Sequence, residues 1–146
     1  MTDAHDAFPS SRLLMQLGAV LLLLGLLTGL AVPMAALPRM ALASHLEAIL
    51  NGMLLIILGV IWTRLVLGPR QRIAAFWLVI YAAFANWTAT LISAFTGAAA
   101  MMPLAGGGSA GAAPFELAVA TLLLSLTLAI LIGVGLVIYG LRPARA

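Results

Sequence analysis

The sequence predicts an all-α fold: a four-helix bundle, integral to a membrane, that forms a single domain over residues 1–146. Hydrophobic residues make up 64% of the chain and charged residues only 8%, and the mean hydropathy is +1.20. A soluble domain carries about 25% charged residues, so a surface this poor in charge requires the lipid bilayer as its solvent. Four apolar runs are also long enough to cross a bilayer, which takes about 20 mostly apolar residues each.

These apolar runs are separated by segments rich in residues that break helices. Pro33 and Pro38 follow the first run, and Gly68–Arg72 is a tight polar turn after the second. A glycine-rich loop at 106–109 precedes the last run. Residues 1–10 are polar and are expected to form a flexible cytoplasmic tail. We therefore expect helices at about 13–32, 45–67, 73–98 and 115–141.

The arginine residues lie almost entirely on one side of the expected membrane. Arg39 is the exception, and the others are Arg12, Arg64, Arg70, Arg72, Arg142 and Arg145. The positive-inside rule then places both termini in the cytoplasm, as expected for a multi-pass protein of a bacterial-type inner membrane. No basic patch interleaved with aromatic side chains is present in the sequence, so no nucleic-acid partner is expected.

Glycines form a stripe along the first expected helix. Gly18, Gly25 and Gly29 share one face, and 25–29 is a G-x-x-x-G motif. Such stripes allow helix backbones to approach closely in lipid. The stripe is equally consistent with packing inside the chain and with an oligomer interface.

His45 is the strongest candidate ligand in the chain. We expect it at the first position of the second helix, where the helix dipole and the lipid both disfavour the imidazolium and leave a neutral ring with a free lone pair. A neutral imidazole binds a metal or haem iron. Ala48 and Gly52 follow on nearly the same face and would leave room for something large and flat. The alternative is a structural histidine that bonds a loop carbonyl, which is the commoner role of a lone histidine.

Metal sites built from several side chains are not expected. Cysteine is absent, which excludes disulfides, thiolate metal sites and covalently attached c-type haem. The other histidine, His5, lies in the tail, whereas zinc needs three or four ligands.

Polar residues inside the apolar runs allow two interpretations. Ser44 and Glu47 fit the capping box S-x-x-E, which we favour for Glu47. Alternatively, Glu47 faces a ligand together with Asn51, which lies one turn further along the same face. Asn86 is expected near the middle of the membrane, where a carboxamide needs either another helix or a ligand as its partner.

These residues resemble the styrene oxide isomerase family of small membrane proteins. The shared pattern is His-x5-Asn-Gly-Met within 45–53, followed on the next helix by aromatic-Ala-Asn at 84–86. The resemblance implies a trimer of four-helix bundles that holds haem b between neighbouring protomers, with His45 as the axial ligand and Asn51 in the active-site pocket. It also implies that ferric iron acts as a Lewis acid on an epoxide oxygen, so that a hydride shift converts a small lipophilic substrate into an aldehyde.

The resulting prediction is an isomerase with non-covalently bound haem b. Its residues are the iron ligand His45, the further haem contacts Ala48, Gly52 and Trp87, and the catalytic residues Asn51 and Asn86. The chain departs from the family at Ala82 and Thr90, which stand where the isomerases have an aspartate and a tyrosine that shape the pocket. The alternatives are a haem sensor or electron-transfer protein without isomerase activity, and a cofactor-free accessory membrane subunit.

Overall fold

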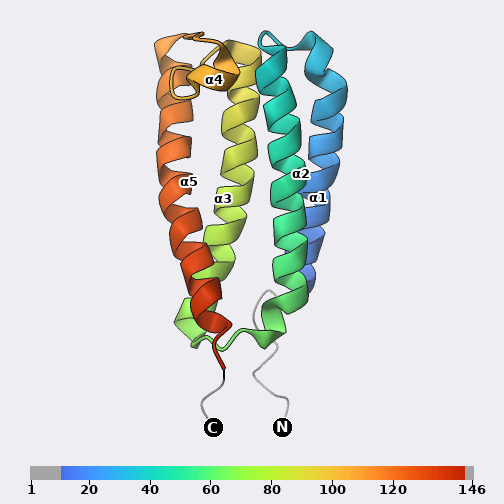
Figure 1. The fold of residues 1–146 in the computed structure, drawn as a ribbon, viewed down its shortest axis with the longest axis vertical. Coiled ribbons are helices and arrows are strands. Elements are labelled where there is room, and N and C mark those ends of the chain that lie inside the picture. Colours follow the sequence, from blue (N-terminus) through green and yellow to red (C-terminus); the bar gives the residue numbers. More distant parts are fainter. Residues whose placement is uncertain (1–10, 144–146) are drawn as a thin grey trace.

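The computed structural model describes residues 11–143, which are helical apart from short connections (Figure 1). The four long helices are α1 (Ser11–Ala31), α2 (Pro38–Ile61), α3 (Pro69–Thr96) and α5 (Ala113–Gly140). The short elements are η2 (Val32–Met34), η3 (Trp62–Arg64) and α4 (Pro103–Gly106). Each long helix is long and apolar enough to cross a membrane. The chain is therefore an all-helical, multi-pass membrane protein, and the expected tail at 1–10 lies outside the described residues.

The four long helices pack in the order α1, α2, α3, α5. Extensive contacts join α1 to α2, α2 to α3 and α3 to α5, whereas α1 touches α3 only along a short stretch. In Figure 1 the outer positions are accordingly taken by α1 and α5, with α2 and α3 between them. The start of α1 and the end of α5 lie at one end of the bundle, and α4 and the α1–α2 connection lie at the other. We call this second end the loop end.

Glycine makes the contact between α1 and α2 very close. A Cβ atom added to Gly18 would lie 2.6 Å from the Gly52 carbonyl oxygen, and one added to Gly52 would lie 2.7 Å from that of Gly18. A Cβ atom on Gly25 would lie 2.8 Å from the Cβ of Ala48. The glycine stripe of the first helix therefore serves packing within the chain, where close approach of the backbones replaces water exclusion as the source of stability.

The second long helix begins at Pro38, and the expected start at His45 is wrong. Proline is well tolerated in the first turn of a helix, because its missing N–H would have no partner there. The N–H of Leu37 also donates to the carbonyl of Ala94 at 2.9 Å, which ties the start of α2 to α3. His45 consequently lies two turns inside α2. The other three helices lie within a few residues of their expected ranges.

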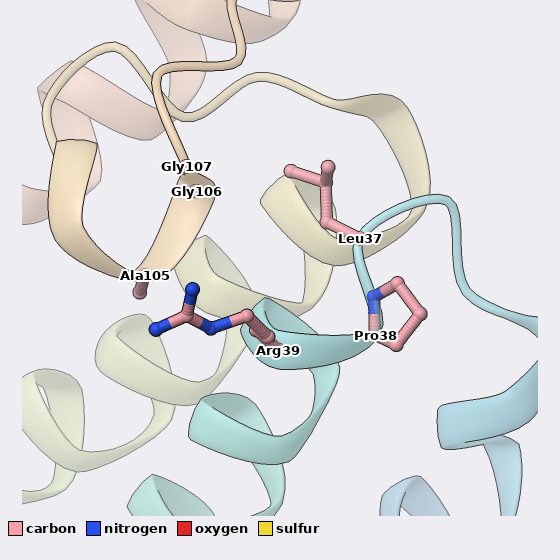
Figure 2. A pocket seen from close by; sticks show the side chains of 6 residues that line it. All are labelled: Leu37, Pro38, Arg39, Ala105, Gly106 and Gly107. Atoms are coloured by element: carbon pink, nitrogen blue, oxygen red, sulfur yellow. The ribbon is translucent and has the colours of Figure 1, made fainter.

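The loop end is closed by contacts of its own. Glu116, in the first turn of α5, accepts the N–H of Gly111 at 2.7 Å and that of Ala100 at 3.2 Å, so it caps the loop. A cavity of about 100 Å³ lies between the start of α2 and α4, as Figure 2 shows. It is lined by Leu37, Pro38, Arg39, Ala105, Gly106 and Gly107. None of the predicted site residues lines this cavity.

Candidate functional site

The ring of His45 is held between α2 and α1. Its Nδ1 atom lies 2.7 Å from the carbonyl oxygen of Gly25. Because a carbonyl only accepts, Nδ1 carries the proton and donates, and in the neutral ring Nε2 is left with a free lone pair. Gly29 provides the space for the ring, since a Cβ atom there would lie 2.7 Å from Nδ1. A histidine that binds a metal typically donates its other N–H to a carbonyl or carboxylate in this way.

The residues next to His45 along the same flank of α2 are packed against α1. Ala48 and Gly52 are both buried, the first against Gly25 and the second against Gly18. The space that their small size leaves is therefore filled by α1 within the single chain. Their packing fixes the position of the helix turn from which His45 projects.

Glu47 lies on the other flank of α2 and faces α3. The Nδ2 atom of Asn86 donates to Glu47 Oε2 at 2.6 Å, and Nδ2 of Asn51 lies 3.4 Å from the same oxygen. The capping box expected at Ser44 and Glu47 is therefore wrong, because both residues lie inside the helix and the carboxylate binds side-chain amides. Glu47 and Asn51 are neighbours on one face of α2, as the alternative interpretation requires, and its expectation that they face a ligand stays a prediction. We call Glu47, Asn51 and Asn86 the carboxylate–amide cluster.

Trp87 joins this region to α1. Its indole N–H donates to Thr28 Oγ at 3.1 Å, and the Thr28 hydroxyl donates in turn to the Leu24 carbonyl at 2.8 Å. The hydroxyl of Ser44 lies 3.4 Å from the Trp87 carbonyl oxygen. These contacts bind α1, α2 and α3 together close to the loop end. Thr28 was not among the predicted site residues, because a threonine in a membrane helix usually bonds only its own helix and gives no signal in the sequence.

Ala82 and Thr90, the two positions at which the chain departs from the family pattern, offer no free polar hydrogen to a ligand. Ala82 is 2% exposed and packs with Ala85, Leu126 and Ala129 at the contact with α5. Thr90 is 5% exposed, and its hydroxyl lies 3.0 Å from the backbone carbonyls of Asn86 and Trp87 on its own helix. These two positions therefore contribute packing here.

The predicted site residues thus divide between two flanks of α2. His45, Ala48 and Gly52 face α1, whereas Asn51 faces the side where Asn86 approaches from α3. The loop-end cavity, at about 100 Å³, is smaller than the roughly 300–1,000 Å³ of typical small-molecule pockets. One copy thus presents an imidazole nitrogen with a free lone pair on one flank of α2 and a polar cluster on the other.

Comparison with known proteins gives consistent matches over nearly the whole chain. The family model of styrene oxide isomerase matches residues 10–142. Hydroxylaminobenzene mutase HabB of Ectopseudomonas oleovorans is 50% identical over 146 residues, which covers 99% of this chain and 88% of HabB. Hydroxylaminobenzene mutase HabA of the same organism is 44% identical over 107 residues, which covers 73% of this chain and 79% of HabA. No solved structure matches. The chain therefore belongs to the styrene oxide isomerase family, and its function is of the isomerase or mutase type.

Proposed function

We propose that the chain is a membrane-embedded mutase that acts on an aromatic hydroxylamine, with hydroxylaminobenzene as the first candidate. Half of all positions are identical to HabB along almost the full length of both chains, which supports a shared substrate class. In such a rearrangement the N–O bond breaks, a C–O bond forms on the ring, and the proton lost by the ring carbon is balanced by one gained at nitrogen. The product is an aminophenol, with no net oxidation or reduction.

The observation that carries this proposal is the carboxylate–amide cluster. Asn86 and Asn51 come from different helices, yet both donate to one oxygen of Glu47. Polar groups at this depth are costly in lipid unless they meet a partner or a ligand. In our proposal Asn51 and Asn86 bind the polar end of the substrate and orient it, while its apolar ring stays in an apolar surrounding.

We propose further that His45 binds haem b. The donor geometry fits this cofactor, since Nδ1 is held by Gly25 and Nε2 keeps its lone pair. Ala48 and Gly52 act on the cofactor through the position of His45, and Trp87 remains a predicted haem contact. The chemistry that ferric haem supplies when bound is Lewis-acid polarisation of the substrate oxygen.

The assembly that we propose is a homo-oligomer, a trimer by family resemblance, with the haem between neighbouring copies. The tight contact between α1 and α2 leaves no gap for a macrocycle beside His45 within one chain, which supports a site shared with a neighbour. The proposed location is a bacterial-type inner membrane with both termini in the cytoplasm. A small lipophilic substrate would then reach the site from the bilayer.

Epoxide isomerisation is the second candidate, and the family model favours it by name. The buried Ala82 and the self-bonded Thr90 argue against it, because the isomerases use an aspartate and a tyrosine at these positions. We set the haem sensor, the electron carrier and the cofactor-free subunit aside, because both relatives are named as mutases.

Turnover by the purified full chain tests the proposal. The protein in detergent is incubated separately with hydroxylaminobenzene and with styrene oxide, and the products are separated by chromatography. We expect an aminophenol from the first substrate and little or no aldehyde from the second. An absorption spectrum of the same sample tests the cofactor, since bound haem gives a Soret band. Conversion of styrene oxide alone would favour the second candidate.

A further inference from the structure

The carboxylate–amide cluster has more free acceptors than free donors. The hydroxyls of Ser44, Thr28 and Thr90 and the indole N–H of Trp87 all donate to atoms of the chain itself. Within the cluster, one N–H of each amide is directed to Glu47. What remains is one further N–H on each amide and three oxygens, namely Asn51 Oδ1, Asn86 Oδ1 and Glu47 Oε1.

These three oxygens have no hydrogen-bond donor in the described part of the chain, yet they are not sealed inside it. Among residues 11–143, the only fully buried side-chain polar atom without a partner is Ser93 Oγ. The free oxygens of Glu47, Asn51 and Asn86, all half-buried residues, therefore reach the surface of the single chain. Surface oxygens in a membrane-spanning region require a donor from a ligand, from water or from another chain.

We propose that Glu47 is a positioning residue that determines whether this site presents hydrogen-bond donors or acceptors to a ligand. A carboxylate only accepts hydrogen bonds, so an Asn86 amide turned the other way would place two oxygens 2.6 Å apart. Glu47 thereby holds the N–H groups of Asn51 and Asn86 inward and leaves their carbonyl oxygens free. The site then selects substrates that carry N–H or O–H donors.

This inference deepens the proposed function and rests on it, because it gives a physical reason for the proposed preference for a hydroxylamine over an epoxide. A hydroxylamine presents both an N–H and an O–H to the free oxygens, whereas an epoxide presents only an acceptor. Sites built to hydrogen-bond a substrate donor reject analogues that lack the donor, because the buried acceptors are then left unpaired. The orientation of two amides, set by one carboxylate, is thus a determinant of substrate class.

The test measures binding, so that it is independent of turnover. Dissociation constants of aniline, which has two N–H donors, and of N,N-dimethylaniline, which has none, are determined by equilibrium dialysis on the full chain in detergent. The ratio of the two dissociation constants reports how strongly the site prefers a ligand that carries a hydrogen-bond donor. In Glu47→Gln the new amide can donate to Asn51 and Asn86, which frees both to turn. We expect the preference for aniline to fall about tenfold, which corresponds to about 1.4 kcal/mol.

Two further variants make the result specific. Glu116→Gln removes the carboxylate that caps the loop end and should leave the ratio unchanged, because Glu116 contacts only backbone N–H groups. Glu47→Asp keeps the charge on a shorter side chain and should give an intermediate ratio. This variant also tests the proposal if Glu47→Gln does not fold. An unchanged ratio in both Glu47 variants overturns the proposal. A chain that fails to convert hydroxylaminobenzene but shifts its ratio refutes only the proposed reaction.

Discussion

The Nδ1 atom of His45 lies 2.7 Å from the carbonyl oxygen of Gly25. This contact links the second turn of α2 to α1 and decides which ring nitrogen is free. It is also the contact on which the proposed cofactor site depends. A histidine at the first position of a helix, as expected from the sequence, would have had only loop groups to orient it.

The first prediction is that His45→Ala abolishes stoichiometric haem. His45 is the only histidine within residues 11–143, and no group of three or more metal-ligating side chains occurs there. Absorption spectra of the purified protein measure the outcome. His5→Ala, outside the described residues, is the control and should keep full haem. An unchanged Soret band in His45→Ala contradicts the assignment.

The second prediction concerns Gly29, which lies directly against the His45 ring. In Gly29→Ala the new Cβ atom meets the ring at 2.7 Å, so the ring has to move and its bond to Gly25 weakens. We expect a cost of about 1–3 kcal/mol, as for other overpacked sites, together with weaker haem retention. Gly135→Ala is the matched control, since nothing lies within 4 Å of the new atom. Thermal unfolding in detergent and the haem content should separate the two variants.

The third prediction is that Asn51→Leu lowers kcat/KM for the substrate without unfolding the helix. Leucine suits both lipid and helix, so the change removes an amide at little cost in stability. A lost hydrogen bond between substrate and site is worth about 0.5–1.5 kcal/mol, or more where a charge takes part, so we expect a decrease of about tenfold. Gln16→Leu, at an exposed carboxamide near the start of α1, should have no such effect. Equal loss of kcat/KM in both variants would argue against a role for Asn51 in the site.

The fourth prediction is that Ala82→Asp does not create epoxide isomerase activity and instead destabilises the chain. Ala82 is 2% exposed against Leu126 and Ala129, so the carboxylate would be buried in an apolar contact without a partner. Burial of an unpaired charge is among the most destabilising changes known. Thermal unfolding should show a clear decrease in stability. A stable variant that converts styrene oxide would show that this position faces the substrate after all.

The fifth prediction concerns assembly. Native mass spectrometry in mild detergent should give a trimer with one haem per chain if the proposed shared site is correct, since the tight contact between α1 and α2 leaves no gap for a macrocycle beside His45. The same measurement on His45→Ala should show less haem. The mass of that variant's assembly then reports whether the trimer forms without the cofactor. A monomer that retains haem is incompatible with a shared site.

The sequence was sufficient to predict the membrane class and the four long helices, because composition and the length of the apolar runs decide both. It was not sufficient for the start of α2. Pro38 was interpreted as a residue that breaks a helix, whereas it occupies the first turn, where proline is favourable. That error placed Ser44 and Glu47 at a helix end and favoured the capping box. With the correct start, Ser44 and Glu47 lie inside the helix, which favours the interpretation that pairs Glu47 with Asn51.

The helical spacing placed His45 and Asn51 on different flanks of α2, but which neighbouring helix each flank meets was beyond the reach of the sequence. Membrane helices are apolar on all sides, so no polar face indicates which neighbour a given residue meets. The contact between Glu47 and Asn86 joins residues 39 positions apart, and that between Trp87 and Thr28 joins residues 59 apart. Neither leaves a periodic signal. The resemblance identified His45 and Asn51 as important but could not tell which helix each of them faces.

The close glycine contact between α1 and α2 has a consequence for biogenesis. His45, Gly25 and Gly29 all belong to the hairpin that ends at residue 61, so the nitrogen proposed to bind iron is oriented by the first hairpin alone. Chains emerge from the ribosome N-terminus first, and early segments fold as units. The carboxylate–amide cluster, by contrast, needs Asn86 of α3 and is completed only after the second half is inserted. The contacts that orient His45 are thus all available before α3 is synthesised, whereas the carboxylate–amide cluster is not.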